Sequence, residues 1–296
     1  MDWRQFVMNL DALDPTAVEN AFLSLGAASV TLTDAGDDPV LEPGPGETPL
    51  WDNTRITGLF PDDADLDAFV EALRATLAVK QLPDYRIETL EDRAWEREWL
   101  KDFGPMRFGR RLWICPTGQT VSEPDAVVVR LDPGLAFGTG THPTTALCLE
   151  WLDSIDLAGR TMLDYGCGSG VLAIAALKLG STAAVGMDID PQAVIATRQN
   201  AVDNGVAEDL AVFGDADEIP GEFDVVVANI LAGPLVQFAD SITSHLAEGG
   251  MLALSGVLCE QADKVLMTYE PWIDFEEPVF REQDGQTWSR LTGRKR

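Results

Sequence analysis

Three glycines stand at alternate positions where a predicted strand gives way to a helix. The strand is Thr161–Tyr165, the glycines are Gly166, Gly168 and Gly170, and an apolar helical run begins at Val171. Glycines at such a turn let the backbone approach a ligand closely, and the start of a helix presents free N–H groups. The residues therefore predict a ligand-binding turn rather than an empty loop.

The spacing of this turn favours a cationic ligand over a dinucleotide. The dinucleotide fingerprint Gly-x-Gly-x-x-Gly would need glycine at position 171, where this chain has valine. Asp164 precedes the turn, and its negative charge would repel a pyrophosphate. A ligand with a sulfonium and an ammonium group would be compatible with that charge. The turn therefore predicts S-adenosylmethionine, with Gly166 and Gly168 against it.

Three aspartates follow the next two strands. Asp188 ends the predicted strand 183–188, 22 residues after Gly166, a spacing at which an acid accepts hydrogen bonds from ribose hydroxyls. Asp190 precedes a proline and predicts a helix N-cap. Asp215 follows the third strand, where an adenine ring would lie. A contact with adenine and an ordinary acidic loop are equally good interpretations of Asp215.

Asn229 stands at the end of the fourth predicted strand, 223–229. In doubly wound sheets, ligands bind in the crevice at the carboxyl ends of the strands. The side-chain oxygen of Asn229 could accept a hydrogen bond from an amine and so direct the nitrogen lone pair toward a methyl group. Capping of the following helix is an equally good interpretation.

The stretch 132–145 predicts a flexible loop that leads into a helix near Pro143. Phe137 is flanked by small residues and could close over the ligand to exclude water. Thr145 lies in the first helical turn and could bind a carboxylate or support the loop. For His142 a helix-capping or loop-ordering role is favoured over that of a catalytic base.

The elements that must position these residues fall into two domains. Residues 1–91 predict the order βαββαβ of a small ferredoxin-like α+β domain, and residues 92–103 predict a charged linker helix. Residues 104–296 alternate short apolar strands with helices, which predicts an α/β, doubly wound, seven-stranded Rossmann-like sheet. An Asp-Gly pair at 284–285 predicts an antiparallel hairpin at its edge. Further strands are expected at 111–116, 126–131, 210–213, 250–255, 276–282 and 287–291.

The composition limits the possible partners. The chain has 49 Asp and Glu against 21 Lys and Arg, a formal net charge of -28. Such a charge repels nucleic acid and favours a basic partner, although it also suits a cytoplasm of high ionic strength. Four cysteines without a Cys-x-x-Cys pair and only two histidines make a metal site unexpected. No signal peptide or membrane-length apolar run is found, so we expect a cytoplasmic, monomeric protein without membrane contacts.

Four stretches together resemble the PrmA family, whose members methylate ribosomal protein L11. They are Leu131–Thr145, Gly166–Gly170, Asp188–Pro191 and Asn229–Leu235. The resemblance covers nearly the whole chain and is strongest between 130 and 260. It implies a class I methyltransferase domain, S-adenosylmethionine as the methyl donor, and ribosomal protein L11 as a basic protein substrate that the N-terminal domain recognises.

The resemblance also assigns roles to single residues. It places Thr145, Gly166, Asp188 and Asn229 at the donor, and it implies trimethylation of the α-amino group and of lysine ε-amino groups of ribosomal protein L11. Displacement at a sulfonium methyl needs orientation and a dry site more than it needs a base. We therefore expect Asn229 to act by positioning the amine, and we expect no dedicated base.

Two other functions remain compatible with the sequence. The first is methyl transfer to another protein, RNA, a glutamine side chain or a small amine. The net charge disfavours RNA, and glutamine-modifying relatives usually carry Asn-Pro-Pro-Tyr where this chain has Asn-Ile-Leu-Ala at 229–232. The second is an inactive module that binds the donor and ribosomal partners; intact Gly166, Asp188 and Asn229 speak against it.

Overall fold

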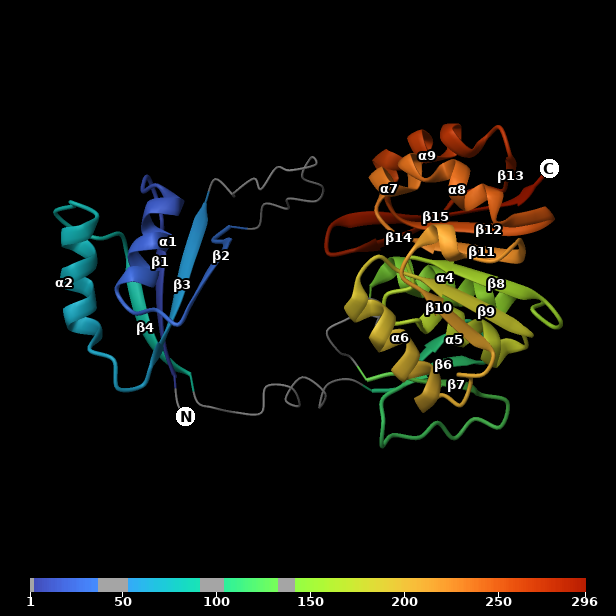
Figure 1. Ribbon diagram of the computed structural model, residues 1–296, viewed down its shortest axis with the longest axis horizontal. Helices are drawn as coiled ribbons and strands as arrows, with labels where there is room; N and C mark the ends of the chain where they lie inside the picture. The colour runs from blue at the N-terminus through green and yellow to red at the C-terminus, as the bar shows by residue number, and fades with distance from the viewer. Residues whose placement is uncertain (1–2, 37–52, 91–103, 133–141) are drawn as a thin grey trace. The chain divides into compact units, whose positions relative to one another are not determined.

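The structure is a computed structural model that describes residues 3–36, 53–90, 104–132 and 142–296 (Figure 1). The chain divides into two compact units, Met1–Glu98 and Trp99–Arg296, each described by itself below. The predicted linker helix at 92–103 and all but Asp34, Ala35 and Gly36 of the predicted acidic loop at 34–49 lie outside the described residues. Among the described residues, the helices are all too short or too polar to cross a membrane.

The N-terminal unit has the ferredoxin-like order βαββαβ. Its sheet is antiparallel with strand order β2-β3-β1-β4. Asp14 caps the first helix with its side chain, and Asp65 caps the second in the same way. Apolar side chains from both helices and the sheet form one core. The elements are β1 (Trp3–Asn9), α1 (Pro15–Ser24), β2 (Ser29–Asp34), β3 (Thr54–Pro61), α2 (Leu66–Thr76) and β4 (Tyr85–Leu90).

A three-stranded sheet opens the C-terminal unit. Its strands are β5 (Met106–Phe108), β6 (Leu112–Cys115) and β7 (Val127–Arg130). The β5–β6 pair is antiparallel and the β6–β7 pair is parallel. The sequence predicted β6 and β7 but not β5, because three residues are too few to show an alternation of apolar and polar side chains.

The main sheet of the C-terminal unit has the doubly wound order expected from the sequence. Seven strands follow the path β10-β9-β8-β11-β12-β15-β13, and β14 pairs with β15 as an eighth strand off this path. The first five are parallel, and β15 is antiparallel to β12. The strands are β8 (Thr161–Tyr165), β9 (Ala183–Met187), β10 (Leu210–Phe213), β11 (Phe223–Asn229), β12 (Leu246–Leu258), β13 (Ile273–Phe275), β14 (Val279–Gln283) and β15 (Gln286–Lys295).

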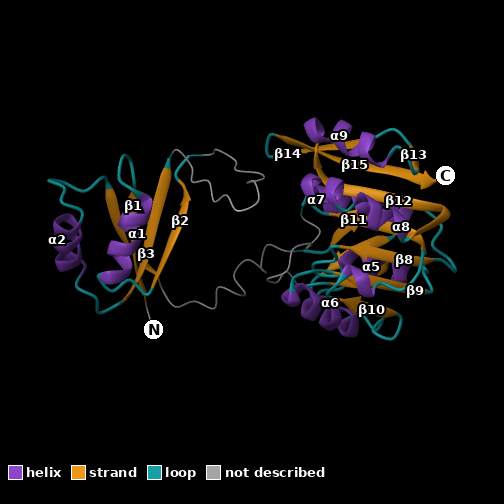
Figure 2. Cartoon of the chain, turned by 45° about the horizontal axis from the view of Figure 1, so that its top comes forward, coloured by secondary structure: helices purple, strands orange, loops and turns teal. Residues whose placement is uncertain are grey.

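Helices cover both faces of this sheet (Figure 2). Alternate strand residues face opposite cores: Met162 and Val225 pack with α4, α5 and α6, whereas Leu163 and Val226 pack with α7, α8 and α9. Two buried faces explain why the central strands are nearly continuous apolar runs. The helices are α4 (Pro143–Ser154), α5 (Val171–Leu179), α6 (Pro191–Asp203), α7 (Ala232–Gln237), α8 (Ala239–Ser244) and α9 (Ala262–Tyr269).

The predicted hairpin near the C-terminus is present as β14 and β15. Asp284 and Gly285 form its turn with φ values of 53° and 76°, and two successive positive φ values match the twist of paired strands. Strand β12 runs from Leu246 to Leu258, beyond the predicted 250–255, because Leu246 pairs with Phe223 of β11 and Met251–Leu258 pair with β15.

Candidate functional site

The ends of the parallel strands meet at one edge of the main sheet. In register, Tyr165 lies beside Met187, Met187 beside Phe213, and Asn229 beside Ser255. The glycine turn, Asp188 and Asp215 follow these strand ends directly and therefore share the edge with Asn229. The sheet brings together most of the residues that the sequence singled out.

The glycine turn has a backbone that only glycine adopts comfortably. Gly166, Gly168 and Gly170 have φ values of 81°, 54° and 76°. A Cβ at Gly166 would collide with the Ile230 side chain, and one at Gly170 would lie 2.6 Å from Thr197 Cγ2. The turn is thus closely packed against neighbouring elements.

The start of α5 is already supplied with hydrogen-bond acceptors. Asp164 Oδ2 accepts from Ala173 N at 3.2 Å, and Ser169 Oγ accepts from Val171 N at 3.4 Å. Asp164 is fully buried, and its Oδ1 has no hydrogen-bond partner among the described residues. A buried carboxylate bound to an N–H of the first turn of this helix makes the place unfavourable for phosphate and favourable for a cation.

Asp188 holds the glycine turn in place. Its Oδ2 accepts from Gly168 N at 2.8 Å, and its Oδ1 accepts from Asp190 N at 3.0 Å. An ionised carboxylate has about four acceptor positions, so both oxygens retain capacity for ribose hydroxyls. Asp190 caps α6 by accepting from Gln192 N at 2.9 Å, which confirms its predicted role.

Asn229 contacts the start of α4 instead of capping the next helix. The N-cap of α7 is Leu231, and no side chain caps that helix, which excludes the capping interpretation of Asn229. The Asn229 Nδ2 donates to Thr145 Oγ1 at 3.2 Å. The Asn229 Oδ1 is buried and has no hydrogen-bond partner among the described residues. It is an unused acceptor beside the glycine turn.

Helix α4 is held at both ends. At its start, His142 is the N-cap: its Nδ1 lies 2.7 Å from Thr144 Oγ1 and accepts from Thr144 N at 3.4 Å. The His142 ring also packs edge-on against Trp288, with ring centroids 4.7 Å apart. Burial lowers the pKa of His142 below its usual value. The capping role that the sequence favoured for His142 is confirmed.

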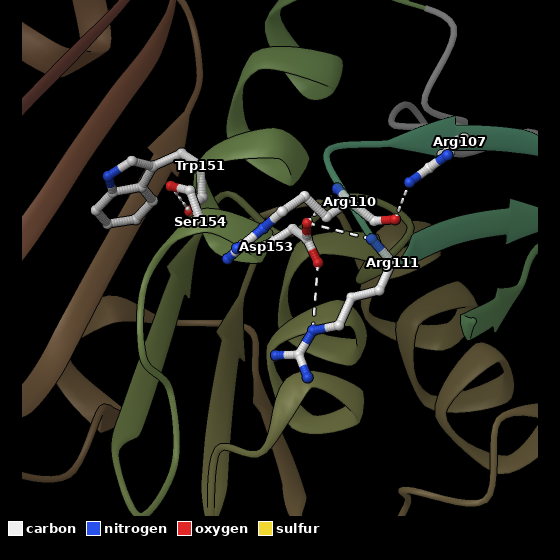
Figure 3. Close-up of polar contacts among 6 residues, drawn as sticks. All are labelled: Arg107, Arg110, Arg111, Trp151, Asp153 and Ser154. Atoms are coloured by element: carbon white, nitrogen blue, oxygen red, sulfur yellow. Dashed lines mark hydrogen bonds and ion pairs between the residues drawn. The ribbon is translucent and has the colours of Figure 1, made fainter. Parts of the chain in front are cut away.

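Near its other end, α4 is joined to the turn between β5 and β6 (Figure 3). The buried Asp153 accepts from Arg110 N at 2.5 Å and from Arg111 N at 3.4 Å, and pairs with Arg111 Nε at 3.5 Å. Gly109 lies so close that a Cβ there would be 2.5 Å from the Asp153 carboxylate. These contacts fix the helix that carries Thr145.

The two remaining candidates are less well defined by the structure. Asp215 lies after β10 and accepts from Asp217 N at 3.0 Å, capping a short 3-10 helix at Ala216–Glu218. This local hydrogen bond neither supports nor contradicts a contact between Asp215 and adenine, which stays a prediction. Phe137 lies outside the described residues.

Two residues of α6 support the turn and were missed in the sequence. Thr197 Oγ1 donates to Gly168 O at 2.9 Å, and Asn200 Nδ2 donates to Ser169 O at 2.8 Å. Their spacing of three places both side chains on one face of the helix. That spacing could have indicated a polar face on α6. The sequence does not indicate which element packs against this face.

Comparison with known proteins identifies relatives over the whole chain. The family model described as ribosomal protein L11 methyltransferase (PrmA) matches residues 2–296. A ribosomal protein L11 methyltransferase from Shewanella sediminis is 50% identical over 294 residues, with 99% of each chain covered. One from Aeromonas hydrophila is 51% identical over 296 residues, covering 100% of this chain and 99% of the relative.

A solved structure agrees with these relatives. The crystal structure of ribosomal protein L11 methylase from Lactobacillus delbrueckii subsp. bulgaricus has a TM-score of 0.57 and 31% identity. The match covers 66% of this chain and 99% of that one. The assignment of the chain to a family rests on the full-length matches to the family model and to the two relatives.

Proposed function

Because the chain belongs to the ribosomal protein L11 methyltransferase (PrmA) family, we propose that it methylates amino groups of ribosomal protein L11. S-adenosylmethionine is the methyl donor. The observation that carries the proposal is the buried Asn229 Oδ1 beside the glycine turn, which has no hydrogen-bond partner in the described part of the chain. This oxygen atom can accept a hydrogen bond from a substrate amine next to the proposed site of the methyl donor.

The residues of the edge fit S-adenosylmethionine. The buried Asp164 carboxyl attracts a cationic donor when it is ionised, and positions 166, 168 and 170 of the turn carry no Cβ atoms that would obstruct a ligand. We propose that Asp188 accepts hydrogen bonds from the ribose, that Gly166, Gly168 and Thr145 line the donor site, and that Asp215 and Phe137 contact the donor from their loops.

The mechanism requires orientation more than proton transfer. When bound, S-adenosylmethionine supplies an electrophilic methyl group on a sulfonium. Asn229 Oδ1 accepts an N–H from the amine and so turns the nitrogen lone pair toward that methyl group. A lysine amine has an ordinary pKa of about 10.4, and burial beside a cation lowers it, so the proton is lost to solvent before attack.

We propose the α-amino group and lysine ε-amino groups of the substrate as acceptors, each trimethylated. Residues 1–91 are proposed to recognise the substrate and residues 104–296 to carry out the transfer. The net charge of -28 favours encounter with a basic ribosomal protein. The same charge disfavours contact with nucleic acid and self-association, so we propose a monomer that does not bind nucleic acid directly. We propose a cytoplasmic location because the proposed substrate is a ribosomal protein.

A labelled-methyl assay tests the proposal. The purified chain is incubated with labelled S-adenosylmethionine and unmethylated ribosomal protein L11, and incorporation is compared with that into RNA, a glutamine-containing peptide and a small amine. We expect label in the protein amines. Donor binding without incorporation anywhere would instead favour a binding module, and label in RNA, glutamine or the small amine alone would favour another acceptor.

Donor affinity is expected to fall as the pH drops below about 7. Burial, together with a smaller effect of the nearby Asp188, outweighs the hydrogen bond from Ala173 and raises the pKa of the Asp164 carboxyl to about 7. Above that pH the ionised carboxylate attracts the cationic donor, and below it the neutral acid does not. The affinity changes at most about tenfold per pH unit, measured by calorimetric titration between about pH 5.5 and 8.

Asp164→Asn is the control for this pH dependence. The amide is of similar size and its oxygen can still accept from Ala173 N, but it does not titrate. The variant should bind the donor with a flatter pH profile. An unchanged slope in Asp164→Asn would show that another group, such as His142, causes the dependence.

Removal of the His142 imidazole is expected to cost stability but not turnover. His142→Ala loses the cap of α4, worth about 1 kcal/mol, and should lower Tm by about 2–4 °C. His142→Asn can cap the helix and should regain most of that loss. Turnover should fall far less than the ~10²-fold expected for a general base. A folded, donor-binding His142→Ala without turnover would contradict the base-free mechanism.

A further inference from the structure

The side-chain amide of Asn229 is hydrogen-bonded to the hydroxyl of Thr145. The two side chains come from elements 84 residues apart, the start of α4 and the end of β11. Thr145 is fully buried and receives the Asn229 Nδ2 at 3.2 Å. With the amide nitrogen held there, the Oδ1 of the same amide is directed elsewhere, and it is buried without a partner among the described residues.

The surroundings make this orientation rigid. Thr145 lies in the first turn of α4, whose start is capped by His142 and whose far end is tied to the β5–β6 turn through Asp153. Ser255 Oγ lies 3.5 Å from Thr144 O and joins the same turn of α4 to β12. These contacts restrain the turn of α4 whose Thr145 hydroxyl accepts from Asn229 Nδ2.

The number of N–H bonds on a neutral amine falls with each methylation. An unmethylated primary amine has two N–H bonds, the monomethylated secondary amine has one, and the dimethylated tertiary amine has none. Oδ1 of an amide is an acceptor only. It can therefore accept a hydrogen bond from the unmethylated and the monomethylated amine. The dimethylated amine, which is the nucleophile of the third transfer, has no N–H to donate.

We propose that Thr145 is a positioning residue that presents Asn229 Oδ1 to the amine, and that this pair assists the first and second methyl transfers but not the third. The inference rests on the proposed function of the site. It predicts a difference between steps of one reaction, which a merely structural contact between Thr145 and Asn229 would not produce.

Each step balances in the same way. The amine nitrogen uses its lone pair to form a bond to the methyl carbon while the carbon–sulfur bond breaks, and the electron pair of that bond stays on sulfur in S-adenosylhomocysteine. After the first and second transfers the ammonium product loses a proton to solvent before the next attack. The third product is a quaternary ammonium and has no proton to lose.

Two forms of ribosomal protein L11 separate the steps. The unmethylated protein reports the first transfer, and protein dimethylated at its amines by reductive methylation with formaldehyde reports the third. Single-turnover rates are measured on both for the wild type, Asn229→Ala, Thr145→Val and Thr145→Ser. Donor affinity of each variant is measured by calorimetry, so that a loss of donor binding is recognised separately.

The expected result is a loss that depends on the substrate. Asn229→Ala should slow transfer to the unmethylated protein about 100-fold, and its loss on the dimethylated protein should be at least tenfold smaller. Thr145→Val, which keeps the shape but removes the hydroxyl, should slow transfer to the unmethylated protein about tenfold more than transfer to the dimethylated protein. Thr145→Ser should restore transfer to the unmethylated protein. The double variant should be no slower than Asn229→Ala alone.

Two outcomes would overturn the inference while leaving the proposed function intact. One is an equal loss on both substrates in Asn229→Ala. The other is a Thr145→Val variant whose rate on the unmethylated protein matches that of the wild type. A wild type that methylates neither form would overturn the proposed function itself, and the inference with it.

Discussion

Replacing Asp188 with alanine is expected to weaken S-adenosylmethionine binding by about 1–3 kcal/mol, which is roughly a 5- to 150-fold rise in Kd. The carboxylate has two tasks at this edge of the sheet. It accepts from Gly168 N at 2.8 Å and so shapes the glycine turn, and we propose that its remaining acceptor positions bind the ribose. Alanine would remove both, and a calorimetric titration measures the sum.

Asp190→Ala is the matched control for Asp188→Ala. Asp190 is two residues away and exposed, and its side chain caps α6 at Gln192 N instead of the turn. Its loss should cost about 1 kcal/mol of folding stability and leave donor affinity unchanged. Unaltered donor affinity in Asp188→Ala would refute the ribose assignment. Equal losses of affinity in both variants would point to a disturbance of α6 rather than to lost contacts with the donor.

Replacing Asn229 with alanine is expected to lower the rate of the first methyl transfer by about 10²-fold. Alanine removes the Oδ1 acceptor that would orient the amine, and it also leaves Thr145 Oγ1 without the Asn229 Nδ2. Because the proposed main role of Asn229 is to position the acceptor, donor affinity should fall much less than the rate. Single-turnover kinetics and calorimetry on the same preparation separate the two effects.

Asn229→Asp tests the role of the acceptor atom itself. Aspartate keeps an oxygen toward the amine, and its second oxygen can accept from the Thr145 hydroxyl. Its added charge favours the protonated amine, so its rate should recover relative to alanine mainly at high pH. If aspartate and alanine were equally slow at every pH, orientation through a hydrogen bond would not be the role of Asn229.

Much of the fold was predictable because it depends on local chemistry. The glycines at 166, 168 and 170 indicated a turn with positive φ values, and the Asp-Gly pair at 284–285 predicted the hairpin. The caps at Asp190 and His142 depend on residues within two positions along the chain. Strand β5 was missed because three residues carry no readable period.

The candidate site was predictable only in part. Asp188 was identified from its spacing to the glycine turn, but its bond to Gly168 N was not. Thr197 and Asn200 looked like ordinary polar positions of α6, and only their contacts with the carbonyls of the turn show that they support it. Asn229 had two equally good interpretations until the cap of α7 was found at Leu231.

The sequence by itself determined the glycine turn, the order of the strands along the chain and the helix caps at His142 and Asp190, since each depends on residues close together in the chain. The tertiary structure decided that Asn229 meets Thr145 across 84 residues, that Asn229 Oδ1 has no hydrogen-bond partner among the described residues, and that Asp164 is buried. The physical reason is that a period of apolar residues specifies which face of a strand or helix is buried. It does not specify which partner covers that face or in what register.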